Sequence, residues 1–207
     1  MLDINEVIKY VKDNPKEIIK SFSDAIEIAN SMNRHIYLGD IDEGVGDSVD
    51  DLIRFWNKED EDNNIPVEDR QPIKIFINSG GGDLFATFTM VNSIRMSKTP
   101  VWTINTGSAY SGGFLTFISG HKRFAYPYAS FMLHEGSCNG AGGDAGKFRN
   151  FAAFYEKCLD ILRDIVIEFT DISEEDYAKH RLEDWWFTAK EAKEYGIFDE
   201  YATEHVF

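Results

Sequence analysis

The spacing of hydrophobic residues divides the chain into a helical first part and a second part in which strands and helices alternate. Over residues 1–33, apolar side chains recur every three or four positions, which is typical of helices, and Pro15 interrupts the pattern. We therefore expect a helical N-terminal extension made of two short helices or one broken helix. A short strand over 34–38 and a further helix over 47–56 should follow.

Residues 58–72 have the sequence KEDEDNNIPVEDRQP, which is acidic, polar and contains two prolines. A segment of this composition has little apolar surface to bury, and its prolines interrupt regular hydrogen bonding. The sequence therefore predicts an exposed loop at this position.

From Ile73 onward, short apolar runs alternate with helical patterns. The expected strands cover 73–77, 101–104, 123–126 and 130–133. The expected helices cover 84–96, a short apolar segment that begins at Ser111, and 147–170. Because strands alternate with helices, we expect an α/β domain with a mainly parallel sheet.

The amino-acid composition limits which binding partners and which cellular location we expect for the protein. The chain has 207 residues, of which 43% are hydrophobic, enough for one domain with a substantial core. Its net charge of −15 repels phosphate backbones, so no nucleic acid partner is expected. No apolar run reaches the roughly 18–20 residues that span a bilayer, and no signal-peptide segment is visible. Cys138 and Cys158 lack metal-ligand spacing, so we expect reduced thiols, a cytoplasmic protein and no membrane contact.

A glycine-rich turn, NSGGG at residues 78–82, follows the first of these strands. Consecutive glycines allow positive φ and a close approach of the backbone to a ligand, so their amides could bind a phosphate or an oxyanion. The phosphate-binding patterns GxxxxGK[ST] and GxGxxG are absent, which weakens the phosphate interpretation. A plain tight turn is the remaining alternative.

A serine and a histidine stand at two further strand ends. Ser108 and Ser111 lie in GSAYSGG, and Ser111 directly precedes the glycines, as in a nucleophile elbow. A serine at a helix start is also a common N-cap. His134 ends the apolar strand SFML, where α/β folds place their active crevices. It acts as a base only with a nearby serine and an orienting carboxylate, and is otherwise structural.

Four separated motifs together resemble the proteolytic subunit of Clp proteases, the ClpP family. These are IFINSGGG, GSAYSGG, FMLHE and EDWWFTAKEAKEYGIFDE, in the order and spacing of that family, and the resemblance covers roughly Arg34 to Tyr201. It implies a ClpP/crotonase-like fold of repeated ββα units with a protruding handle helix. Residues 34–207 would form the peptidase domain. The glycine-rich run 136–146 and the helix after it resemble the handle that joins two rings.

The resemblance assigns roles residue by residue. Ser111 matches the nucleophile, His134 the general base and Asp184 the acid that orients the base, although Glu183 is adjacent. The backbone N–H groups of Gly82 and Gly112 match the pair that forms the family's oxyanion hole. Gly81 and Leu84 match the edge that pairs with an extended peptide substrate.

The chain departs from the family pattern around this cleft. Gly80 replaces the proline of the glycine turn, Asp83 replaces a hydrophobic residue, and Glu135-Gly136 replaces Gln-Pro after the histidine. None of these changes removes a matched triad residue. Such divergence is typical of phage-borne or otherwise specialised relatives.

The implied activity is that of a serine endopeptidase that forms an acyl-enzyme and needs no metal or organic cofactor. Its substrates would be peptides or unfolded proteins, cleaved inside stacked heptameric rings of this chain, and an AAA+ ATPase unfoldase is a candidate partner. The long helix over 147–170 is apolar on more than one face, which also favours burial against another subunit. The alternatives are an inactive ring or scaffold subunit, and a crotonase-type hydratase or isomerase.

Overall fold

The computed structural model describes residue 13, residue 26, and residues 29–137 and 144–206. The chain divides into two compact units, Met1–His35 and Ile36–Phe207. The helical extension expected over residues 1–33 falls largely outside the described residues and stays a prediction. Among the described residues, no helix has both the length and the apolar character that crossing a bilayer requires.

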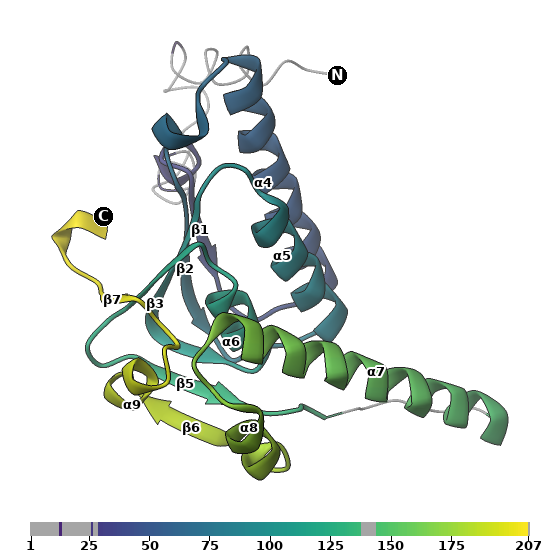
Figure 1. Cartoon of the computed structure of the whole chain (residues 1–207). Helices are drawn as coiled ribbons and strands as arrows, with labels where there is room; N and C mark the ends of the chain where they lie inside the picture. The colour runs from purple at the N-terminus through teal and green to yellow at the C-terminus, as the bar shows by residue number, and fades with distance from the viewer. Residues whose placement is uncertain (1–12, 14–25, 27–28, 138–143, 207) are drawn as a thin grey trace. The chain divides into compact units, whose positions relative to one another are not determined.

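The unit Ile36–Phe207 is built on a seven-stranded, mainly parallel sheet (Figure 1). Its strands are β1 (His35–Leu38), β2 (Ile73–Ser79), β3 (Val101–Tyr110), β4 (Lys122–Ala125), β5 (Ser130–Leu133), β6 (Trp185–Thr188) and β7 (Glu200–Tyr201). The order is β1-β2-β3-β4-β7, and β5 pairs with β3 and β6. The predicted α/β class with a mainly parallel sheet is confirmed.

The strand β3 divides the sheet in two. Its first half, to Asn105, pairs in parallel with β4, whereas Ser108–Tyr110 pair in parallel with β5. β6 pairs with β5 in the antiparallel direction, ending at the pair Leu133 and Trp185. The sequence predicted a strand over 101–104 only, because the polar residues after Ile104 break its apolar pattern. The continuation to Tyr110 brings the end of β3 beside the end of β5.

Helices pack around the sheet. They are α4 (Glu43–Asp62), α5 (Leu84–Met96), α6 (Gly112–Ile118), α7 (Ala145–Phe169), α8 (Glu174–His180) and α9 (Ala189–Glu194), with 3-10 turns η1 (Val67–Asp69) and η2 (Glu204–Val206). Aspartate caps explain several helix starts, since Asp42, Asp83 and Asp144 accept backbone N–H groups in the first turns of α4, α5 and α7.

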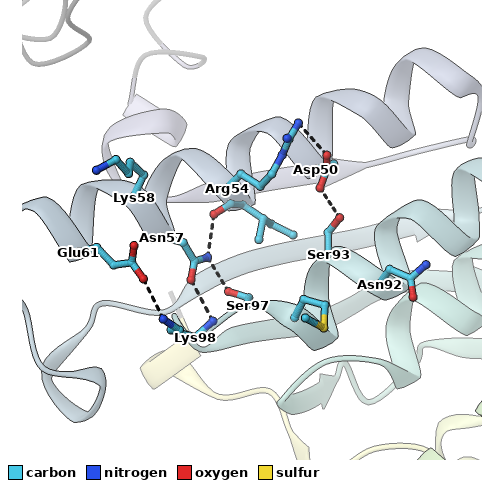
Figure 2. Close-up of a pocket in the computed structure, with 11 residues that line it drawn as sticks. Asp50, Arg54, Asn57, Lys58, Glu61, Asn92, Ser93, Ser97 and Lys98 are labelled. Carbon is cyan, nitrogen blue, oxygen red and sulfur yellow. Dashed lines mark hydrogen bonds and ion pairs between the residues drawn. The ribbon is translucent and has the colours of Figure 1, made fainter.

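Polar side chains join α4 to α5 and to the turn after it (Figure 2). The side-chain amide of Asn57 on α4 makes two contacts: its Nδ2 donates to the Ser97 hydroxyl at 2.7 Å, and its Oδ1 accepts the backbone N–H of Lys98 at 2.9 Å. Ser93 on α5 donates to Asp50 at 2.5 Å. These contacts fix the position of α5, whose N-terminal end borders the glycine turn.

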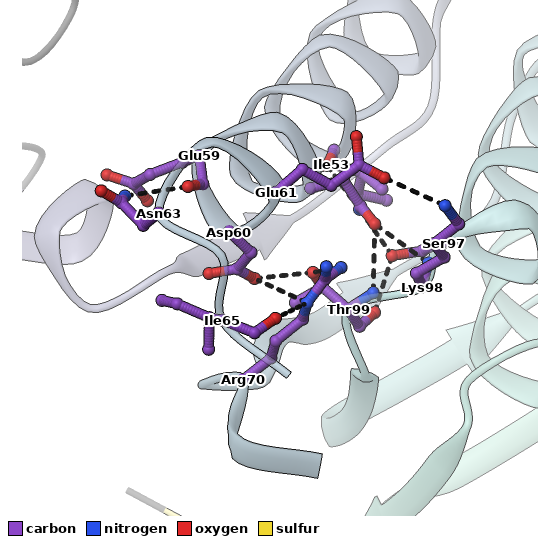
Figure 3. A network of polar contacts seen from close by, with 11 residues as sticks. Ile53, Glu59, Asp60, Glu61, Asn63, Ile65, Arg70, Ser97, Lys98 and Thr99 are labelled. Carbon is purple, nitrogen blue, oxygen red and sulfur yellow. Dashed lines mark hydrogen bonds and ion pairs between the residues drawn. The ribbon is translucent and has the colours of Figure 1, made fainter. Parts of the chain in front are cut away.

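The segment 58–72 is exposed over most of its length, as predicted, but it is not a loop throughout and two of its charged residues are buried. α4 continues to Asp62, and Asp60 and Arg70 are buried, at 0% and 9% exposure. Thr99 donates to the Asp60 carboxylate at 2.7 Å, and the Arg70 Nε lies 4.0 Å from the same oxygen (Figure 3). Arg70 also donates to the carbonyl oxygen of Ile65 at 3.1 Å. Asp60 can be buried because Arg70 and Thr99 partner its charge. The acidic composition of the segment gave no sign of this buried pair.

α7 extends away from the sheet (Figure 1). Its C-terminal half contributes Cys158, Leu162 and Val166 to the core, whereas its N-terminal half leaves large apolar side chains exposed. The exposed ones in that half are Phe148, Phe151 and Phe154, and Ile161 in the C-terminal half is exposed as well. The predicted protruding helix with apolar residues on more than one face is therefore confirmed.

We expect the substitution Arg70→Met to destabilise the fold by about 3 kcal/mol, because it leaves Asp60 buried without its cation. Thermal denaturation followed by circular dichroism measures this change. Arg54→Met is the matched control, since Arg54 pairs with Asp50 and Asp51 on an exposed face of α4. Equal melting temperatures for the two variants would contradict the assignment.

Candidate active site

Ser111 lies between β3 and α6 in a strained backbone conformation. Its φ is 54° and its ψ is −121°, a region that residues with a side chain seldom adopt. It occupies the N-cap position of α6, but its side chain makes no capping hydrogen bond. Its backbone N–H donates to the carbonyl oxygen of Met132 on β5 at 2.9 Å. The sequence left open whether Ser111 only caps the helix. Because its hydroxyl does not cap α6, it is available for another contact.

The structure brings Ser111, His134 and Asp184 together in a hydrogen-bonded row. The distance between His134 Nε2 and Ser111 Oγ is 2.8 Å, and that between His134 Nδ1 and Asp184 Oδ1 is 2.9 Å. The tautomer with its proton on Nδ1 donates to Asp184 and accepts from the serine hydroxyl. The His134 side chain is 26% exposed and the Asp184 side chain 55% exposed. A neutral imidazole held this way can accept the hydroxyl proton.

Strand register explains why these three residues meet. Tyr110 on β3 pairs with Met132 on β5, so Ser111 follows β3 beside the end of β5. Leu133 pairs with Trp185 in the antiparallel direction. His134 leaves β5 at the point where Asp184 enters β6, which brings the two side chains into contact.

Ser108 and Glu183 are the neighbouring candidates that the sequence offered beside Ser111 and Asp184, and in the structure both have other partners. The Ser108 hydroxyl donates to the Asn78 side chain at 3.0 Å and has no contact with His134. The Glu183 carboxylate lies 2.5 Å from Nδ1 of His180. Ser111 and Asp184, rather than Ser108 and Glu183, are therefore the residues that contact His134.

The glycine turn is forced into its conformation by close backbone packing. Gly81 and Gly82 have φ of 97° and 151°. A Cβ on Gly82 would lie 2.0 Å from the carbonyl oxygen of Ile41, and one on Gly81 would lie 2.7 Å from the Ser111 Cβ. Ile41 holds the turn, since it donates to the Gly81 carbonyl and accepts from Asp83, each at 2.9 Å. No motif pointed to Ile41, because its contribution is made by its backbone.

The amides predicted to bind an oxyanion border the same cavity as Ser111. Gly82 and Gly112 line a cavity of about 480 Å³ together with Ser111 and His134. No hydrogen bond within the described residues engages the amide of Gly82 or Gly112. A side chain at Gly112 would meet the Thr87 hydroxyl at 2.4 Å, so this position also requires glycine.

The remaining walls of the cavity combine apolar and polar residues. Leu84, a predicted substrate-binding residue, lines it, whereas Gly81 is buried behind Ser111 and does not. The other lining residues come from α5, α6, α7 and the segment after β5, and include Phe85, Leu115, Glu135, Phe151, Tyr155 and Leu162. Phe85 stacks on Phe154 of α7 at 6.2 Å between ring centroids. Apart from Leu84, the sequence did not predict the contributions of α5 and α7, because they depend on long-range packing.

Other reactive groups lie apart from this cavity. The thiol of Cys158 is free and buried, and burial raises its pKa. Cys138 is outside the described residues. Across the part of the chain that the structure describes, no cluster of three His, Cys, Asp or Glu residues has metal-binding geometry.

Two comparisons with known proteins bear on this geometry. A family model described as Clp protease matches residues 23–205. The chain is also 31% identical over 182 residues to the ATP-dependent Clp protease proteolytic subunit 2 of Corynebacterium diphtheriae. That alignment covers 86% of this chain and 87% of the relative.

We expect Gly82→Ala to slow the covalent labelling of Ser111 by a fluorophosphonate about 100-fold, because the new Cβ displaces the turn and its amide. Labelling rates at fixed probe concentration measure the effect. Gly39→Ala is the control, since a Cβ there meets nothing within 4 Å. If both alanine variants label at the wild-type rate, the turn does not act on Ser111.

Proposed function

The chain belongs to the Clp protease family, and from this membership we propose that it is a serine endopeptidase that cleaves peptides and unfolded polypeptides. The observation that carries the proposal is the row of hydrogen bonds from Ser111 through His134 to Asp184. An inactive ring or scaffold subunit needs no such row, and a crotonase-type hydratase gives these three side chains no role.

In the proposed reaction, His134 Nε2 accepts the Ser111 proton while the serine oxygen attacks the carbonyl carbon of the scissile bond. Asp184 keeps the imidazole in the required tautomer and stabilises its protonated form. The imidazolium then gives its proton to the leaving amine, which leaves an acyl-enzyme. A water molecule, deprotonated by the same imidazole, releases the acyl group and restores the serine.

The negative oxygen that forms during each attack needs donors that are already in place. The amides of Gly82 and Gly112 are the proposed donors, because both border the cavity beside Ser111 and lack other partners among the described residues. Leu84, which lines the cavity, is the proposed contact of an extended substrate. The contact predicted for Gly81 stays a prediction from the sequence, because Gly81 is buried and its N–H and carbonyl are bonded to Ser79 and Ile41. Each of these steps uses side chains and backbone groups of this chain.

The proposed assembly is two stacked rings of seven subunits that enclose the cleavage sites. It is supported by α7, whose N-terminal half carries Phe148, Phe151 and Phe154 with little cover. Exposed apolar surface of this kind favours a protein interface. An AAA+ ATPase unfoldase is the proposed partner, and a cytoplasmic location stays a prediction from the sequence.

We expect a fluorophosphonate to label the wild type at Ser111 and to leave Ser111→Ala unlabelled. Peptide hydrolysis by the assembled Ser111→Ala variant should fall by at least about 10⁴-fold, because no other hydroxyl contacts His134 in the described structure. Mass spectrometry of the adduct identifies the labelled residue. Ser108→Ala, whose hydroxyl contacts Asn78, should label normally. An unlabelled wild type in its assembled form would favour the scaffold alternative.

We expect Phe148→Glu to convert the assembled protein into smaller species, because a charge replaces an exposed aromatic side chain on α7. Sedimentation velocity measures the change in size. Phe148→Leu keeps the position apolar and should assemble as the wild type does. A wild type that sediments as a stable, active monomer would contradict the proposed assembly.

A further inference from the structure

The loop that carries Asp184 lies outside the strand ladder. The pairing of β5 with β6 ends at Leu133 and Trp185, so no ladder hydrogen bond fixes His134 against Asp184. The Asp184 side chain is 55% exposed, and its contact with His134 alone would be weakened by competing water. Something beyond the ladder must hold these two chain segments together if the imidazole is to keep one orientation.

An ion pair spans these two segments directly beyond the ladder. The Arg181 Nε lies 3.1 Å from the Glu135 carboxylate. Glu135 follows His134 in the chain, and Arg181 precedes Asp184 by three residues at the end of α8. The pair therefore connects the two segments one step beyond the His134–Asp184 contact.

Glu135 is more firmly held than a surface carboxylate. Its side chain is only 15% exposed, and its backbone carbonyl accepts the Tyr155 hydroxyl of α7 at 3.2 Å. It lines the large cavity beside Ser111 and also a small cavity of about 10 Å³ bordered by Tyr177 and Arg181. Glu135 thus lies between the proposed substrate cavity and the small cavity bordered by Tyr177 and Arg181.

The environment behind Glu135 leaves Arg181 as its cation. The Tyr177 hydroxyl is buried, and burial together with the Glu135 charge raises its pKa to about 12. The two groups are close enough for this effect but do not meet hydrogen-bond geometry. Tyr177 therefore stays neutral at working pH. Two histidines also line this small cavity: His180 is paired with Glu183, and His134 with Asp184.

We propose that the Arg181–Glu135 ion pair is a positioning device that holds the Asp184 loop against the end of β5, so that Asp184 can orient His134. The proposal rests on the proposed serine peptidase function. Neither residue contacts the reacting atoms: Arg181 acts through the loop to Asp184, and Glu135 acts through the backbone at His134. Loss of the pair changes how often the row of hydrogen bonds is formed. Its loss through Arg181 leaves the wall of the substrate cavity unchanged, because Arg181 does not line that cavity.

The test is a double-mutant cycle of Arg181→Met and Glu135→Gln in the full-length, assembled protein. Each single variant should lower kcat for peptide hydrolysis about tenfold, because misplacement of the base affects the chemical step. Arg181→Met should leave KM within about twofold, because Arg181 does not line the substrate cavity. The double variant should lose no more than either single variant. Arg181→Lys, which keeps the charge, should recover most of kcat.

Two controls separate positioning from general stability. Melting temperatures and sedimentation should match the wild type in every variant. Arg54→Gln removes an arginine whose partners, Asp50 and Asp51, lie on α4 away from Glu135, and it should keep wild-type kcat.

Three results would overturn the inference: single variants with kcat within twofold of the wild type, losses that multiply in the double variant, or losses that follow a lowered melting temperature. Fluorophosphonate labelling distinguishes this failure from a failure of the proposed function. A wild type that labels at Ser111 while the variants keep full activity overturns only the ion-pair role. A wild type that does not label overturns the proposed function itself.

Discussion

The position of β5 between β3 and β6 is the constraint on which the candidate site depends. β5 is parallel to β3 and antiparallel to β6, so the end of β3, the end of β5 and the start of β6 meet at one place. Residues separated by 23 and 50 positions in the chain thereby become neighbours. For the first of these contacts, the pairing of Tyr110 with Met132 brings the chain at Ser111 beside the end of β5.

Crowding of the backbone around Ser111 is the second condition. Gly81, Gly82 and Gly112 have neighbours so close that a methyl group would collide with them. Ser111 itself keeps a positive φ, and strain of this kind costs on the order of 1–3 kcal/mol. The buried side chains of α6 and the hydrogen bond from Ser111 to Met132 hold the conformation against this cost. The crowded glycines Gly82 and Gly112 line the same cavity as Ser111.

The sequence predicted the parts of the structure that local chemistry controls. The alternation from β2 onward, the glycine turn and the protruding α7 follow from apolar spacing and from glycine, and the structure confirms them. Sequence motifs also identified Ser111, His134 and Asp184 as candidates, although a helix cap and a structural histidine remained open until the side chains were placed.

The errors and omissions have a common physical origin. The segment 58–72 was expected to be exposed because it is acidic, but Asp60 meets Arg70 and Thr99 in the interior. Ile41 and the Arg181–Glu135 pair act on the site from distant parts of the chain. Contacts between residues far apart in sequence leave no periodic signal, so composition and spacing cannot reveal them.

The division of β3 between two partner strands has a consequence for how the chain can change in length. Two residues, Thr106 and Gly107, separate the half paired with β4 from the half paired with β5. One residue inserted there would advance every later side chain by one step, so that Ala109 and Tyr110 would exchange faces. The spacing of these two positions is therefore as restrictive as the identity of any reactive side chain, even though neither of them takes part in a chemical step.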